Sequence, residues 1–179
     1  LIWLMDLLKE AYKNVLNPDQ FSKGTHCVRI SFRGSGLDVD ISPVIYDGDL
    51  KNKGYLINKD TGDRVLTSIP LHLAFIRKRK KSQPRHFRQV IRLLKWWNRE
   101  KKKGDSDFKF KSFMIELICS HLLDNGCDMS DYPKAMEEFF LYIVKTGLKD
   151  RICFSDNYSI SELPETRNHT IEIFDPVNP

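Results

Sequence analysis

Two aspartates carry the clearest candidate chemistry in the sequence. Asp38 and Asp40 stand two residues apart in the segment LDVDISP, which alternates like a β-strand and ends at Pro43. Because residues i and i+2 of a strand lie on one face, both carboxylates would point the same way. Paired carboxylates of this kind hold Mg²⁺ in metal-dependent phosphoryl-transfer enzymes. From the residues alone, a metal site and an exposed strand face both remain open.

A basic helix expected over residues 85–103 is the second candidate. Its cations recur at helical spacing on one stripe, at Arg88, Arg92, Lys95 and Arg99. The adjoining stripe is apolar and suits a core, with Phe87, Val90, Ile91, Leu94 and Trp97. Stacked cations repel by a few tenths of a kcal/mol per pair, about the size of other exposed helix pairs. A bound triphosphate would relieve that repulsion, and so would carboxylates elsewhere in the fold.

The segment KFKSFMIELICSHLL predicts a third element, an almost wholly apolar helix. We expect Ser112 to cap it and Phe113 to stand in its first turn. An aromatic ring beside a basic stripe can stack on a nucleobase, although a core position is the alternative. Glu116, alone within the apolar run, requires a partner or an exposed face.

The elements that must position these residues follow from periodicity and turn signals. Residues 1–16 carry a helical apolar stripe, and residues 27–32 and 37–44 read as a β-hairpin around Gly34-Ser35-Gly36. Residues 47–63 predict a mobile loop that contains a small hairpin.

The remainder of the chain predicts helices followed by closing strands. Helical patterns fill most of residues 71–148, with breaks near Pro84, at 104–109 and at 125–133. Strand-like runs close the sequence at 151–154 and 170–174. The fold class is therefore α+β, a small antiparallel sheet followed by a mainly helical lobe.

Composition narrows the choice of ligand and compartment. The net charge is +5, and the run RKRKK at 77–81 adds to the basic helix, which favours a polyanionic ligand. No apolar run approaches the roughly 20 residues that span a bilayer, so we expect no membrane association. Four scattered cysteines favour reduced thiols in the cytoplasm. A zinc site at Cys119, His121 and Cys127 matches no common spacing, and buried structural cysteines are favoured.

The motifs occur in a recognisable order along the whole chain: SFRGSGLDVDISPV, TSIPLHLAFI, HFRQVIRLLKWWNR, FKSFMIELI and IEIFDPVNP. This series resembles the bacterial CD-NTases, cyclic-oligonucleotide synthases of CBASS anti-phage systems that are related to oligoadenylate synthase and cyclic GMP-AMP synthase. It is most similar to the clade associated with HORMA-domain partners. The resemblance implies part of a polymerase-β-like nucleotidyltransferase core in residues 1–70 and a helical lobe in 71–179.

The resemblance also implies roles for individual residues. In the family three carboxylates hold two Mg²⁺ ions, which Mn²⁺ can replace, and Asp40 before Ile41-Ser42-Pro43 matches the third. Asp38 matches no required ligand and would only support the site. Lys95 corresponds to the lysine that contacts the donor phosphates, with weaker expectations for Arg88 and Arg92. Ser112 and Phe113 correspond to the residues that hold and stack the donor base.

The implied activity is the joining of nucleoside triphosphates, ATP by preference, into a cyclic oligonucleotide messenger in the bacterial cytoplasm. A HORMA-domain protein and a nucleic-acid activator are the implied partners. The family's opening Gly-Ser helix and first D-x-D strand do not occur in these residues, so we expect a piece of a longer protein that is inactive by itself. The alternative is a non-catalytic nucleic-acid-binding or protein-interaction module that uses the helix at 85–103.

Overall fold

The computed structural model describes residues 1–46, 48, 53–163, 165 and 171–177. The chain divides into two compact units, unit 1 from Leu1 to Ile69 and unit 2 from Pro70 to Pro179. Each unit is described by itself. Small sheets occupy the first and helices dominate the second, so the α+β fold class is confirmed.

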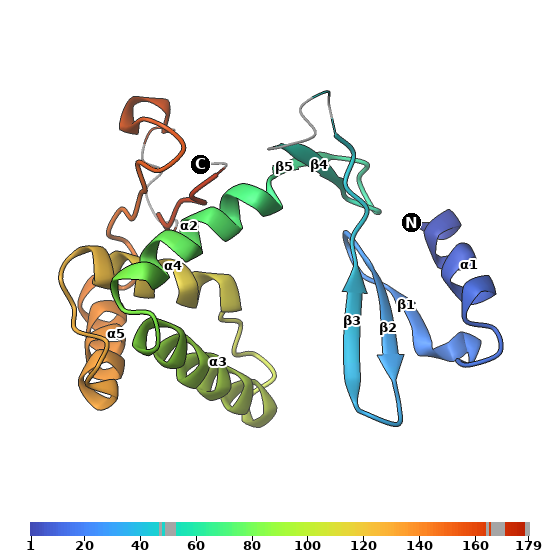
Figure 1. Cartoon of the computed structure of the whole chain (residues 1–179), viewed down its shortest axis with the longest axis horizontal. Helices are drawn as coiled ribbons and strands as arrows, with labels where there is room; N and C mark the ends of the chain where they lie inside the picture. Colours follow the sequence, from blue (N-terminus) through green and yellow to red (C-terminus); the bar gives the residue numbers. More distant parts are fainter. Residues whose placement is uncertain (47, 49–52, 164, 166–170, 178–179) are drawn as a thin grey trace. The chain divides into compact units, whose positions relative to one another are not determined.

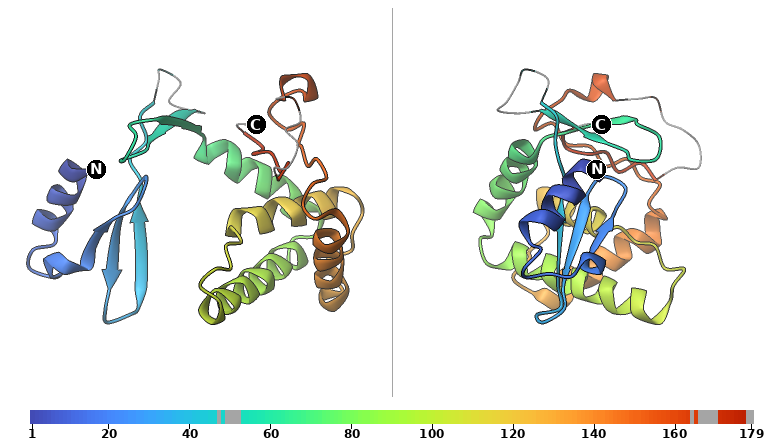
Figure 2. Two further views of the ribbon diagram at one scale, coloured as in Figure 1. Left: turned by 180° about the vertical axis from the view of Figure 1, so that it is seen from behind. Right: turned by 90° about the vertical axis from the view of Figure 1, so that its right-hand side faces the viewer.

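Unit 1 is built around a three-stranded antiparallel sheet in the order β1-β2-β3, and α1 lies beside it (Figures 1 and 2). The strands are β1 (Phe21–Lys23), β2 (Val28–Phe32) and β3 (Leu37–Ile41). The predicted hairpin is confirmed, whereas β1 was not predicted. Gly36 closes the hairpin at φ +67°, a conformation that favours glycine, and its N–H donates to the Phe32 carbonyl at 2.8 Å.

The second sheet of unit 1 pairs β4 (Gly54–Ile57) with β5 (Arg64–Thr67). This confirms the small hairpin expected at 47–63, although its second strand lies beyond that segment. Residues 47 and 49–52 of the predicted mobile loop lie outside the described residues. The short 3₁₀ turn η1 spans Pro18–Gln20.

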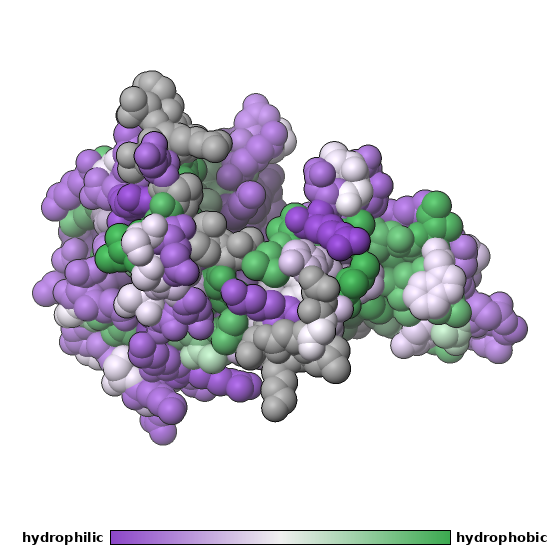
Figure 3. Space-filling view, turned by 90° about the horizontal axis from the view of Figure 1, so that it is seen from above, coloured by the Kyte–Doolittle hydropathy of each residue, from purple (hydrophilic) through white to green (hydrophobic). Residues whose placement is uncertain are grey.

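Helix α1 (Ile2–Ala11) is shorter than the predicted helix at 1–16. Turns follow it up to Pro18, because Asn17 before a proline avoids helical dihedrals and Asn14 is a weak helix former. None of its residues is buried, and large apolar side chains such as Trp3 and Leu7 are exposed. In Figure 3 unit 1 accordingly shows green, hydrophobic surface on its visible face.

Unit 2 contains the helices predicted between 71 and 148. They are α2 (Ile69–Ser82, which begins at the last residue of unit 1), α3 (His86–Gly104), α4 (Ser112–Asp124) and α5 (Tyr132–Thr146). The ends of α5 show why it stops where it does. The Asp131 side chain accepts a hydrogen bond from the Lys134 N–H, and Gly147 ends the helix in the left-handed conformation.

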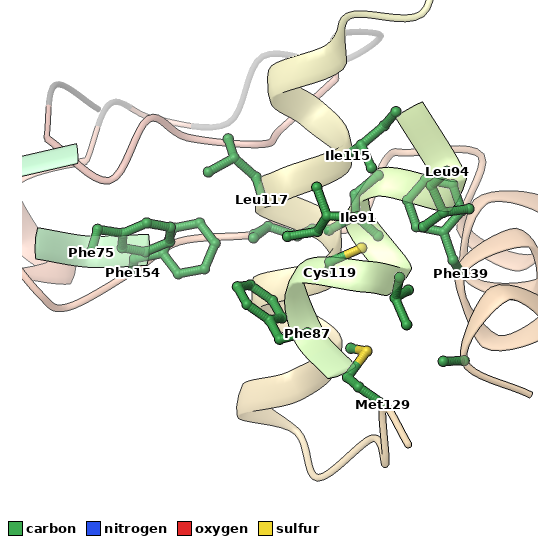
Figure 4. Close-up of a cluster of buried hydrophobic side chains, with 14 residues drawn as sticks. Phe75, Phe87, Ile91, Leu94, Ile115, Leu117, Cys119, Met129, Phe139 and Phe154 are labelled. Atoms are coloured by element: carbon green, nitrogen blue, oxygen red, sulfur yellow. The ribbon is translucent and has the colours of Figure 1, made fainter. Parts of the chain in front are cut away.

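A single apolar cluster holds these helices together (Figure 4). Phe87, Ile91 and Leu94 of α3 face α4, which contributes Ile115, Leu117 and Cys119, and Phe139 joins from α5. The core stripe predicted on α3 is therefore confirmed. Trp97, on the same stripe, packs edge-on against Phe108 and Phe140.

The predicted closing strands are wrong in extent. Within the described residues, the segments 151–154 and 171–174 pair only through one parallel bridge between Ile152 and Ile173. The Ile152 N–H donates to the Glu172 carbonyl at 2.8 Å, and the Phe174 N–H donates to Ile152 at 2.9 Å. Pro176 has no N–H to extend a ladder, so the pairing stays short. Thr170 and Pro164 of this region lie outside the described residues. The 3₁₀ turn η2 spans Ile160–Glu162.

Across the described ranges, none of the helices is both long and apolar enough to span a bilayer.

Candidate functional site

Asp40 is held by a cross-strand arginine. Arg29 on β2 stands directly opposite Asp40 on β3 in the strand register. Its guanidinium donates two hydrogen bonds, from Nε to Oδ1 at 2.8 Å and from Nη2 to Oδ2 at 3.0 Å. These bonds hold the pKa of the Asp40 carboxyl below its ordinary value, although burial acts in the opposite direction. Asp40 is therefore ionised at neutral pH, as a metal ligand must be.

Asp38 lies on the same strand, opposite Ser31. Strand alternation places it on the same face as Asp40, as the sequence predicted, and both residues are exposed. Its charge also acts on the Arg29 guanidinium, which together with the Asp40 bonds raises the pKa of Arg29. Arg29 thus pairs with Asp40 and interacts with Asp38 through its charge.

In unit 2, Lys95 of α3 forms an ion pair with Glu116 of α4 through its Nζ and the Oε1 atom. This supplies the partner that the isolated Glu116 required. The pair crosses the contact between the two helices, and both side chains retain partial exposure. Lys95 is therefore fixed in place while it keeps donors for a further anion, since an ammonium group carries three.

A surface pocket of about 660 Å³ opens beside Lys95. Five cations line it: Arg92, Lys95, Arg99, Lys102 and Lys103. Trp96, Asn98 and Ser112 complete the lining, so in the part of the chain that the structure describes no carboxylate belongs to it. We call this the basic pocket. Its volume lies within the range usual for small-molecule sites, and its charge suits a phosphorylated ligand.

Ser112 reaches the basic pocket but does not cap α4 as predicted. It is the first residue of the helix, and Lys111 occupies the capping position without a side-chain bond. The Ser112 hydroxyl instead accepts a hydrogen bond from Nδ2 of Asn98 at 3.4 Å, and the same amide donates to the Phe110 carbonyl at 3.2 Å. Asn98 is 2% exposed. A buried amide thus fixes the start of α4 against α3.

Phe113 faces a different hollow from its neighbour Ser112. That hollow, of about 360 Å³, is lined partly by Phe113, Lys111 and Asp175. The rings of Phe113 and His72 form a T-shaped pair with centroids 5.5 Å apart, and His72 Nε2 bonds to Asp175 Oδ1 at 2.8 Å. Asp175 Oδ1 also accepts from the Val177 N–H at 2.8 Å, so the IEIFDPVNP segment supports the ring indirectly.

The structure therefore brings together some of the predicted site residues. Arg92, Lys95 and Ser112 share the basic pocket, whereas Arg88 is exposed outside its lining and Phe113 lines the second hollow. Asp38 and Asp40 belong to unit 1 and share one strand face.

Several residues that contact the candidate site residues were not predicted from the sequence. Arg29 was detectable, because a four-residue turn from Arg33 to Gly36 sets it opposite Asp40 in the hairpin. Asn98 and the His72–Asp175 pair offered no signal, since each joins elements whose packing the sequence does not specify.

The fold is thus a small antiparallel sheet with an acidic strand in one unit and a helical core with a phosphate-suited pocket in the other. Comparison with known proteins identifies the family. The chain is 51% identical over 177 residues to a cyclic AMP-AMP-AMP synthase of Escherichia coli strain MS 115-1. This alignment covers 99% of the chain and 54% of that relative. It is 35% identical over 175 residues to the CBASS oligonucleotide cyclase CdnC of E. coli strain KTE188, covering 97% and 52%. No family model matches.

Solved structures agree with these relatives. The structure of E. coli MS115-1 CdnC with ATP matches with a TM-score of 0.83 at 51% identity, covering the whole chain and 56% of that protein. The CdnC:HORMA-deltaN complex matches with a TM-score of 0.82 at 50% identity, covering 99% and 54%. The chain belongs to the CD-NTase family of CBASS oligonucleotide cyclases. It spans about half the length of the relatives that it matches.

Proposed function

We propose that the full-length protein joins nucleoside triphosphates, ATP by preference, into a cyclic oligonucleotide that serves CBASS anti-phage signalling in the bacterial cytoplasm. The observation that carries this proposal is the 51% identity to a cyclic AMP-AMP-AMP synthase across 99% of the chain. In the reaction, a ribose hydroxyl of one nucleotide attacks the α-phosphate of another and pyrophosphate leaves.

The carboxylates of β3 fit a divalent cation. Asp40 is ionised and exposed, and Asp38 lies on the same face two residues earlier. Carboxylate oxygens suit Mg²⁺, with Mn²⁺ as a substitute. We assign Asp40 as the ligand and Asp38 as its weaker support. When bound, two such ions activate the attacking hydroxyl and stabilise the leaving group.

The residues of unit 2 would hold the nucleotide. The Lys95 ammonium, fixed by Glu116, would contact the donor phosphates, and Arg92 would add charge in the same pocket. Arg88, outside the lining, would contribute only at longer range. Ser112 and Phe113 at the start of α4 would hold and stack the base, with the Phe113 ring supported by His72. Residues 1–70 would thus act as part of the catalytic core and 71–179 as the nucleotide-holding lobe.

Asp40 provides the direct test. The full-length protein would be incubated with Mg²⁺ and labelled ATP. Its products would be separated and identified by mass spectrometry. We expect Asp40→Asn to lose product by at least about 100-fold, because the loss of a charged metal ligand removes transition-state stabilisation. Asp38→Asn is the matched control on the same strand and should retain more activity. Equal product from wild type and Asp40→Asn would exclude Asp40 from catalysis.

A protein partner is proposed from the same relatives. CdnC of E. coli MS115-1 has been solved in complex with a HORMA protein, and we propose a HORMA-domain partner for this protein as well. A nucleic-acid activator would bind the basic residues of α3. Product formation should then increase when a HORMA-domain protein or duplex DNA is added. Salt-sensitive nucleic-acid binding with no nucleotide turnover under any of these conditions would instead favour a non-catalytic module.

A further inference from the structure

Two adjacent tryptophans of α3 have opposite surroundings. Trp97 packs against Phe108 at 5.6 Å and Phe140 at 4.8 Å between ring centroids. Trp96 is 57% exposed and lines the basic pocket. Successive helical residues are about 100° apart, so the core contacts of Trp97 turn Trp96 away from the core. The exposed indole is therefore not needed to fill the interior of unit 2.

The cations around Trp96 have a regular arrangement. One cation precedes Trp96 by four residues, and two follow it by three and seven residues: Arg92, Arg99 and Lys103. This spacing places them on the same helix face as Trp96. Glu100, which bonds to Arg99 and Lys103, and Glu116, which bonds to Lys95, both lie outside the pocket lining. Among the described residues, Arg92 has no carboxylate within ion-pair distance. The pocket therefore offers positive charge on both sides of one flat aromatic surface.

Those two features define the chemistry of a ligand. Cations along a helix face attract a chain of phosphates, and an exposed indole stacks on a planar heterocycle. A molecule that carries both groups within reach of a pocket of about 660 Å³ is a nucleotide. Phe113, the base-stacking residue proposed above, lines the separate smaller hollow. A reaction that joins nucleotides must hold at least two of them, so a second aromatic surface has a use.

We propose that Trp96 is a nucleobase-stacking residue of the basic pocket, additional to Phe113, and that Arg92 and Arg99 hold the phosphates of the same nucleotide. The inference rests on the proposed function of this pocket as a nucleotide site. Trp96 would contribute to affinity through the base, whereas the cations would contribute through the phosphates. The two contributions can be separated by ligands that carry only one of the groups.

The test measures binding to the full-length protein by calorimetry with two probes, the α,β-methylene analogue of ATP and inorganic tripolyphosphate. Trp96→Ala should weaken binding of the analogue by about 5- to 150-fold and leave tripolyphosphate binding unchanged. Trp96→Phe, which keeps a stacking ring, should recover most of that affinity. Trp3→Ala is the matched control, since Trp3 is an exposed tryptophan of α1 and should affect neither probe.

Lys95→Ala separates this inference from the proposal on which it rests. If Lys95→Ala weakens both probes while Trp96→Ala weakens neither, the pocket binds nucleotide and the role of Trp96 is wrong. If neither substitution changes binding of either probe, the nucleotide pocket itself is wrong. If Trp96→Ala weakens a single-stranded oligonucleotide but not the ATP analogue, Trp96 belongs to a nucleic-acid surface and the inference is overturned.

Discussion

Among the residues that the structure describes, unit 2 packs fourteen buried side chains into one cluster. The buried apolar residues described in unit 1 are Phe21, Val28 and Ile30. Unit 1 also leaves the apolar residues of α1 exposed. The difference separates two ways to position a functional residue. The basic pocket stands on helices fixed by a shared core, whereas Asp40 stands on a thin sheet and depends on its contact with Arg29.

The largest test of this contrast is a core truncation in unit 2. Phe139 is fully buried against Phe110 and Phe140, so Phe139→Ala should lower the free energy of unfolding by about 3 to 5 kcal/mol. Trp3→Ala, at a position 72% exposed in unit 1, should change it by less than about 0.5 kcal/mol. Denaturant titration of both variants measures this. Comparable losses from the two would contradict the contrast.

A second test concerns the buried cation of unit 2. Arg79 is 7% exposed and stacks on Phe75, while its guanidinium donates to Asp124 at 3.0 Å and to Asp156 at 2.9 Å. Arg79→Ala leaves those carboxylates without their buried partner and should cost about 3 to 5 kcal/mol. Lys78 also bonds to Asp156 but is exposed, so Lys78→Ala should cost at most about 1 kcal/mol. If the two variants lowered the melting temperature equally, burial of the cation would not determine how much its ion pair contributes to stability.

The ion pairs of Arg79 with Asp124 and Asp156 also predict how the stability of the protein depends on pH. Burial acts to raise the pKa of the Asp156 carboxyl, but hydrogen bonds from Arg79 and Lys78 outweigh it and hold that pKa below its ordinary value. A carboxyl with a lower pKa in the folded state stabilises the protein above its unfolded pKa, about 3.9, and this contribution is lost as the pH falls through the folded pKa. Asp156→Asn should therefore flatten the acid limb of the stability curve. An unchanged acid limb would contradict this assignment.

The smallest expected effect belongs to the sheet of unit 1. Arg29 and Asp40 are each about half exposed, so Arg29→Met should cost only about 0.2 to 1 kcal/mol of stability. The pKa of Asp40 should rise toward its ordinary value, because the hydrogen bonds that lower it are gone. Carboxyl-detected NMR titration would follow the change, with Lys13→Met as the control, because it removes an exposed ion pair between Glu10 of α1 and Lys13 of the turn that follows. A loss above about 2 kcal/mol would show that unit 1 depends on this pair.

Local patterns in the sequence predicted the hairpin, the four helices of unit 2 and the core stripe of α3. Those elements follow from periodicity and turn residues, which act over a few neighbouring positions. The closing strands were overestimated, because Ile152 and Ile173 meet from distant segments and a strand-like run does not reveal how many residues will pair. The same limit applied to Ser112, whose hydroxyl bonds to Asn98 across a helix contact instead of capping its own helix.

The site could be predicted only in part for a related reason. Asp40 and Lys95 stand in recognisable motifs, but the partners that hold them, Arg29 and Glu116, come from neighbouring elements. Trp96 and Trp97 are identical in type, and only the packing of α3 shows which of them faces solvent. Residue type thus indicates the possible chemistry, and tertiary contacts determine which of two like residues is accessible to perform it.

The hydrogen bond between His72 and Asp175 spans 103 positions of the chain. During synthesis at about 5 to 20 residues per second, His72 would be added some 5 to 20 seconds before Asp175. Until Asp175 is present, the His72 ring that contacts Phe113 lacks its hydrogen-bond partner. The hollow beside Phe113, which Asp175 helps to line, therefore cannot be completed on a nascent chain until Asp175 has been added.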